Sequence, residues 1–283
     1  MARSTNAKLE EAKSLMLLGE AYQNKGQYTN ALEHYLQAQS IFENSKNKLL
    51  LANANLKLGS LYKTWNIYDK ALKYYQAAYK GYDSGNTKAV IAQNIAEIYT
   101  QKNNYKMGIE WHQKTLNAYR LLKNQPKIIL CLQTLSTLHL KNAQFEEALN
   151  HNLELVELKG KSSNQVGLIE PYNNIGFVYK HQKQYAKALE YYNKALTINK
   201  QNIRTNPSLA ENQIGLLTNT AVVQIHLNNP QAAEAAYNEA LNLSNCLSHK
   251  MMTWLLLIFT IIWQPIIIFI TKHFRPQNMP KTL

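Results

Sequence analysis

Apolar residues recur at helical spacing along most of this chain, in segments of roughly 14 to 17 residues that are joined by short polar turns. One such turn is the stretch from Asn24 to Gln27. The two-residue alternation of a half-buried strand does not recur, and four prolines fall near the predicted helix starts, where a missing amide donor costs little. These are Pro126, Pro171, Pro207 and Pro230. The pattern therefore predicts an all-α protein built from paired helices.

The same two-helix pattern occurs six times. Its clearest copy runs from Asn173 to Tyr179 and from Tyr185 to Leu196, and the third and fourth copies are degenerate in their second halves. A small residue marks each first helix, at spacings of 40, 37, 40, 40 and 45 residues: Gly19, Gly59, Ala96, Ser136, Gly176 and Ala221. A second-helix position holds Tyr35, Tyr75, His112, Asn152, Tyr192 and Tyr237. We expect close helix contacts at the small residues, which a larger side chain would overpack.

These residues resemble the tetratricopeptide repeat over about 240 of the 283 positions. The period of about 40 and the combination of Asn174, Ile175, Gly176 and Tyr179 look most like the longer-repeat members, such as kinesin light chains and cell-polarity adaptors. The resemblance implies a right-handed superhelical solenoid of about six helix pairs. It also implies that the first helices line a concave groove that binds peptides.

In the longer-repeat members, an asparagine two residues before the small residue often hydrogen-bonds the main chain of an extended partner peptide. Asn94, Asn174 and Asn219 occupy that place here, whereas Leu17, Lys57 and Thr134 depart from the pattern. An amide suits the task because it offers an acceptor and two donors to one peptide unit. Helical spacing places further candidates on the same face: Asn53, Lys57, Gln93, Glu97, Gln133, Asn173, Lys180 and His181. The alternative is that these are solvated surface residues of an asparagine-rich chain. The lysine and asparagine pairs of a chaperone-tail clamp are not matched.

Composition narrows the classes of function. The formal charge is +13, and all 18 acidic residues precede position 240. Residues 46 to 127 carry an excess of basic groups that could attract an acidic partner, unless it is simply a solvated lysine surface. Arginine is scarce and no basic and aromatic motif of a nucleic-acid reader is present, so we expect no nucleic-acid partner.

Sequence motifs of enzymes and cofactor sites are missing. There is no phosphate-binding glycine loop, no nucleophile elbow and no histidine pair at metal-binding spacing. The two cysteines, Cys131 and Cys246, are 115 positions apart and predict neither a disulfide framework nor a zinc site. His112 and His139 stand at packing positions, and we expect structural roles for them. The chain is therefore expected to be no enzyme and to hold no cofactor or metal.

The run from Met251 to Thr271 is uncharged and apolar over 21 residues. At about 1.5 Å per residue it would span roughly 31 Å, close to the hydrocarbon core of a bilayer. We therefore predict a solenoid over residues 1–245, a linker over 246–250, a membrane helix over 251–271 and a basic tail over 272–283. Two alternatives are a capping helix on the last repeat and a segment read out of frame at the end of a truncated gene.

Residues 1–18 contain acidic groups and no sustained apolar core, which favours repeats in the cytoplasm. The basic tail favours the opposite orientation. The sequence thus predicts a single-pass membrane adaptor that binds a protein partner through an extended, acidic peptide segment and the lipid bilayer through residues 251–271. The alternative is the sensor portion of a truncated membrane signalling protein of the histidine-kinase or regulator type.

Overall fold

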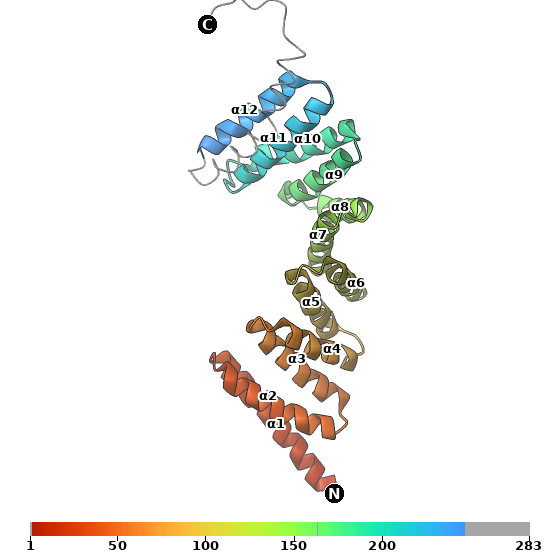
Figure 1. Ribbon diagram of the computed structural model, residues 1–283, viewed down its shortest axis with the longest axis vertical. Coiled ribbons are helices and arrows are strands. Elements are labelled where there is room, and N and C mark those ends of the chain that lie inside the picture. The colour runs from red at the N-terminus through yellow and green to blue at the C-terminus, as the bar shows by residue number, and fades with distance from the viewer. Residues whose placement is uncertain (1, 163, 247–283) are drawn as a thin grey trace, which may run out of the picture. The chain divides into compact units, whose positions relative to one another are not determined.

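The computed structural model describes residues 2–162 and 164–246, and within these ranges all regular structure is helical. The chain divides into two compact units, Met1–Leu155 and Val156–Leu283, which are described separately. Within each unit, helices that follow one another in the chain pack side by side as pairs (Figure 1). The predicted all-α fold of stacked helix pairs is confirmed. Its right-handed superhelical path stays a prediction.

Unit 1 contains three complete helix pairs and most of a fourth. Its helices are α1 (Ala2–Asn24), α2 (Tyr28–Asn44), α3 (Lys48–Thr64), α4 (Tyr68–Gly81), α5 (Asn86–Gln101), α6 (Tyr105–Leu121), α7 (Gln125–Lys141) and α8 (Phe145–Gly160), whose last residues belong to unit 2. Unit 2 continues with the 3₁₀ helix η1 (Gln165–Leu168), then α9 (Ile169–His181), α10 (Tyr185–Asn202), α11 (Leu209–His226) and α12 (Pro230–Cys246). The odd-numbered α-helices are the first helices of their pairs.

The turns between the two helices of a pair share one backbone conformation. A single residue takes the left-handed conformation after the first helix, with φ of 74° at Gly26 and 60° at Lys183. The following amide then bonds back five residues, as in Gln27 N–H to the Tyr22 carbonyl at 2.9 Å, which satisfies a carbonyl at the helix end. The other left-handed residues at this place are Asn66, Asn103, Ala143 and Asn228. Their spacing reproduces the spacing of the small residues in the sequence, so the turns follow the same period.

The small residues allow the second-helix tyrosines to pack against the first helices. A Cβ atom built at Gly176 would lie 2.7 Å from ring atoms of Tyr192, and the same clash arises at Gly19 with Tyr35 and at Gly59 with Tyr75. The fourth repeat replaces this pair with a polar one, because Asn152 Nδ2 donates to Ser136 Oγ at 2.5 Å. Glycine at this position therefore makes room for the tyrosine ring in the first, second and fifth repeats.

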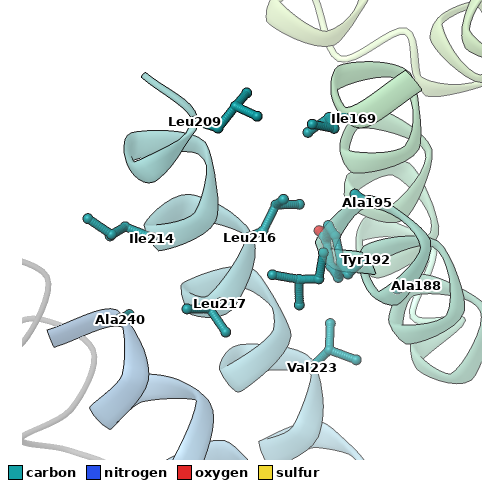
Figure 2. Close-up of a cluster of buried hydrophobic side chains, with 11 residues drawn as sticks. Ile169, Ala188, Tyr192, Ala195, Leu209, Ile214, Leu216, Leu217, Val223 and Ala240 are labelled. Carbon is teal, nitrogen blue, oxygen red and sulfur yellow. The ribbon is translucent and has the colours of Figure 1, made fainter. Parts of the chain in front are cut away.

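Buried side chains from neighbouring helices form the core of each unit. In unit 2, Figure 2 shows Leu216 and Val223 of α11 directed toward α10, where Tyr192 lies between Ala188 and Ala195. In unit 1, Cys131 is 5% exposed and behaves as the small apolar core residue that the sequence predicts. These cores hold the first helices side by side and fix which of their residues face outward.

The predicted membrane localisation is not supported and is corrected. No helix among residues 2–162 and 164–246 is long and apolar enough to cross a bilayer. These helices carry polar and charged side chains on one side of an apolar stripe, which suits packing in pairs. The predicted membrane helix 251–271, the tail 272–283 and all of the linker 246–250 except Cys246 lie outside the described residues.

Candidate functional site

The exposed side of α3, α5 and α7 carries two neighbouring hollows in unit 1. We call this side the first-helix face. The α3–α5 hollow has a volume of about 590 Å³ and the α5–α7 hollow about 290 Å³. Leu56, Lys57, Ser60, Lys63, Thr64, Asn66, Tyr75, Val90, Asn94 and Gln101 line the first hollow. Gln93, Glu97, Thr100, Gln101, His112, Leu130, Cys131 and Thr134 line the second.

Each hollow combines an apolar patch with hydrogen-bonding groups. In the α3–α5 hollow, Val90 is 36% exposed one helical turn before Asn94, and Leu130 is 46% exposed one turn before Thr134 in the next hollow. Tyr75 reaches the first hollow from the second helix because Gly59 has no side chain in its way. Successive first helices thus present an exposed apolar residue followed, one helical turn later, by a polar residue.

Lys63 is the centre of a polar network that joins α3 to α5. Its Nζ lies 2.7 Å from Asn94 Oδ1 and 2.5 Å from Glu97 Oε2. Gln93 Nε2 donates to Glu97 Oε1 at 2.9 Å, and the Tyr119 hydroxyl donates to Gln93 Oε1 at 3.3 Å. The network orients three predicted site residues, Gln93, Asn94 and Glu97, before any ligand binds.

Asn94 keeps capacity for a ligand within this network. Its Oδ1 accepts from Lys63, and its Nδ2 donates to the Val90 carbonyl at 3.0 Å. A side-chain amide has two donor hydrogens and an oxygen that accepts twice, so one donor and one acceptor remain. That pair matches the N–H and C=O of one peptide unit.

The same network sets the charge state of Glu97. Burial alone would raise the pKa of this carboxyl, but hydrogen bonds from Lys63 and Gln93 and the Lys63 charge hold the pKa below its usual value. Lys57 is also paired, with Glu20 Oε1 at 2.7 Å. Both lysines line the α3–α5 hollow, and each is paired with a carboxylate beside it.

His112 forms part of the wall of the α5–α7 hollow and is 4% exposed. Burial lowers its pKa to about 4, although the charge of Glu97 acts in the opposite direction. His112 is therefore neutral at physiological pH and takes the structural role that its repeat position predicts.

This pKa predicts an acid-dependent loss of stability in unit 1. An unfolded histidine binds a proton near pH 6.5, whereas folded His112 resists protonation until about pH 4. Its contribution is present above pH 6.5 and is lost as the pH falls toward 4, by up to about 3 kcal/mol. The double variant Ala96→Gly, His112→Tyr recreates the pair seen at Gly59 and Tyr75, and it should unfold with a weaker pH dependence in this window.

Urea unfolding of both proteins at a series of pH values measures the difference, and Ala96→Gly alone controls for the change in the helix. Parallel stability curves for the double variant and the unmodified chain between pH 4 and 6.5 would show that His112 does not cause the dependence.

Unit 2 has a smaller hollow of about 210 Å³ between α9 and α11. The predicted residues Asn173 and Asn219 both line it, and Asn219 Nδ2 donates to Asn173 Oδ1 at 3.2 Å. Glu170 and Glu211 lie at the same hollow. Its charge is thus opposite to that of the α3–α5 hollow.

The remaining predicted residues do not gather at one place. Lys180 Nζ lies 4.8 Å from the ring centre of Phe177, and the exposed His181 packs its ring on the same phenylalanine at 4.5 Å. Burial lowers the pKa of Lys180. The other three residues are partly buried on three different first helices, with Asn53 on α3, Gln133 on α7 and Asn174 on α9.

The sequence analysis missed Lys63, whose Nζ contacts both Asn94 and Glu97. A signal for it was present, because Lys63 follows Gly59 by four residues and the selected Lys180 follows Gly176 by four. The exposed apolar residues Val90 and Leu130 were also missed. They share one position of the repeat, six residues before the small residue.

The family model described as Tetratricopeptide repeat matches residues 10–84, 88–161 and 167–245, which is most of the chain. The chain belongs to the tetratricopeptide repeat family. A Tonsoku-like protein of Drosophila melanogaster is 24% identical over 219 residues, a match that covers 70% of this chain and 13% of that relative's length.

Solved structures share the fold of this repeat protein. BtubC (BKLC) of P. vanneervenii superposes with a TM-score of 0.55 at 16% identity, covering 99% of this chain and 94% of that one. YrrB, described as a tetratricopeptide repeat protein with an unusual peptide-binding site, has a TM-score of 0.51 at 16% identity, covering 70% and 93%. The likeness to the kinesin light chain subtype stays a prediction.

Proposed function

We propose that this repeat protein is an interaction scaffold that binds an extended, acidic peptide segment of a partner protein along the first-helix face of unit 1. The observation that carries the proposal is the pair of adjacent hollows along α3, α5 and α7, each with exposed apolar residues beside preoriented polar groups. Recognition of this kind combines main-chain hydrogen bonds with pockets for alternate side chains.

The contacts on the first-helix face indicate which groups bind each part of such a peptide. The remaining donor and acceptor of Asn94 pair with one peptide unit, while apolar side chains of the ligand lie against Val90 and Leu130. An acidic side chain near the α3–α5 hollow lies within reach of Lys57 and Lys63. Charge-assisted bonds to the carboxylate would replace contacts that Glu20 and Glu97 now make.

The solved structure of YrrB supports the general mode, since its description assigns that family member a peptide-binding site. The α9–α11 hollow of unit 2 is lined by two glutamates and does not suit the same acidic segment. Asn174 and Asn219 belong to unit 2. The proposal therefore includes them only as a second contact, separate from the first-helix face of unit 1. The sensor portion of a signalling protein, the predicted alternative, has no supporting observation among the described residues or in the comparisons.

Selection from a random twelve-residue peptide display library against the full chain tests the proposal. We expect enriched peptides in which an acidic residue stands close to an apolar one, with saturable binding by calorimetry. Competition is the control for location, because two enriched peptides that bind the same hollows should displace each other. A library that yields no peptide with saturable binding would contradict the proposed function.

A further inference from the structure

A third hollow of unit 1 lies away from the first-helix face, beside the loop that joins α4 to α5. Its volume is about 470 Å³. We call it the α4–α6 hollow. The apolar part of its lining comes from Tyr79, Ala92, Ala118, Leu121 and Leu122, and the polar part includes Asp83, Lys88 and Lys114.

The hollow exists because one second helix is short. α4 has 14 residues and ends at Gly81, whereas α6 has 17 residues and continues to Leu121. The same three residues are missing from the spacing between Gly59 and Ala96, which is 37 where the neighbouring spacings are 40. The last turn of α6 therefore extends past the end of α4, and its leucines stay uncovered: Leu121 is 86% exposed and Leu122 42%.

Two lysines stand at this apolar surface. Lys88 Nζ lies 4.6 Å from the ring centre of Tyr79 and donates to the Asp83 carbonyl at 3.1 Å. Lys114 Nζ lies 4.1 Å from the ring centre of Trp111 and pairs with Glu110 at 2.7 Å. Aromatic faces hold both ammonium groups close to apolar surface, and Glu110 offsets part of the charge of Lys114.

The start of α5 adds to the positive potential. Gly85 is its N-cap and offers no side chain to the first amides, and the first turn of α5 contains no acidic residue. Helix N-termini favour negative groups. Asp83 is the acidic residue that lines the hollow, against two lysines.

We propose that the α4–α6 hollow is a second docking site, which takes an acidic protein segment with a large apolar side chain. The apolar side chain packs on Tyr79, Ala118 and Leu121, and flanking carboxylates face Lys88 and Lys114. Charge decides between occupants: a second copy of this chain brings a net charge of +13, and the chain beyond position 240 carries only basic groups, so both are repelled. The site is independent of the proposed peptide site on the first-helix face.

Binding of a fluorescein-labelled peptide of sequence DDLFDD to the full chain, followed by fluorescence anisotropy, tests the docking site. Methyl spectra of the chain labelled at leucine and alanine locate the contact. We expect shifts at Leu121, Leu122, Ala92 and Ala118, and at least about tenfold weaker binding of the peptide KKLFKK. The double variant Lys88→Glu, Lys114→Glu should weaken DDLFDD by a similar factor.

The matched control is Lys187→Glu, Lys194→Glu in unit 2, where both lysines also lie over aromatic rings and Lys194 pairs with Glu190 at 2.7 Å. This control should bind DDLFDD as the unmodified chain does, and in Lys63→Met on the first-helix face the four methyl signals of the α4–α6 hollow should still shift with DDLFDD. The proposal is overturned if DDLFDD moves none of the four methyl signals, or if KKLFKK binds equally well. It is also overturned if the same signals broaden with protein concentration alone, which would identify a second copy as the occupant.

Discussion

Replacing Gly176 with leucine should lower the free energy of unfolding of unit 2 by about 3 kcal/mol, at the upper end of the usual cost of overpacking. Even a Cβ atom at this position would lie 2.7 Å from two ring atoms of Tyr192, and that ring is fully buried among Ala188, Ala195 and α11 (Figure 2). A leucine at position 176 therefore collides with the buried Tyr192 ring. Urea unfolding followed by far-UV circular dichroism measures the change.

Gly215→Leu is the control for this prediction, because Gly215 lies on α11 of the same unit and a Cβ there would meet nothing within 4 Å. Exchanging that glycine for a better helix former should leave stability unchanged or raise it by up to about 1 kcal/mol. Equal stability of the Gly176 and Gly215 variants would show that the small residue of the repeat is not a packing requirement.

Lys63→Met should weaken binding of an acidic peptide selected on the unmodified chain by about a hundredfold. Methionine keeps much of the length of lysine but removes the charge that faces the α3–α5 hollow. It also removes the bonds to Asn94 and Glu97, so the orientation of Asn94 is lost with the charge. Calorimetry with the selected peptide measures the affinity.

A second measurement separates lost charge from lost structure. Because Lys63 holds the pKa of Glu97 down, the Glu97 pKa should rise in the Lys63→Met variant when it is followed by NMR titration. Lys25→Met, in the exposed turn between α1 and α2, is the control and should change neither affinity nor that pKa. Unchanged affinity in Lys63→Met would remove Lys63 from the proposed site.

Much of the fold could be predicted from the sequence because the same two-helix pattern occurs six times. The small residues, their tyrosine partners and the turn residues recur at the same spacings, and each spacing reappears in the structure as a left-handed turn residue. The network around Lys63 could not be predicted in this way, since it depends on how far a side chain of α3 reaches toward α5.

The α4–α6 hollow could not be predicted from the sequence either. The shortened spacing of 37 residues was visible in the sequence, but it does not say which helix is shorter. Only the positions of Gly81 and Leu121 show that α6 extends beyond α4 and leaves apolar side chains uncovered. Periodicity identifies the elements, whereas the α4–α6 hollow comes from a departure from it.

Photo-crosslinking tests the central claim, that a peptide lies along the first-helix face of unit 1, most directly. A benzophenone amino acid replaces Val90 or Leu130 in the full chain, and the same amino acid replaces the exposed Gln37 of α2 as the control. After irradiation with a selected acidic peptide, mass spectrometry should find the peptide attached at positions 90 and 130 and not at 37. Attachment at 37 with none at 90 or 130 would contradict the account.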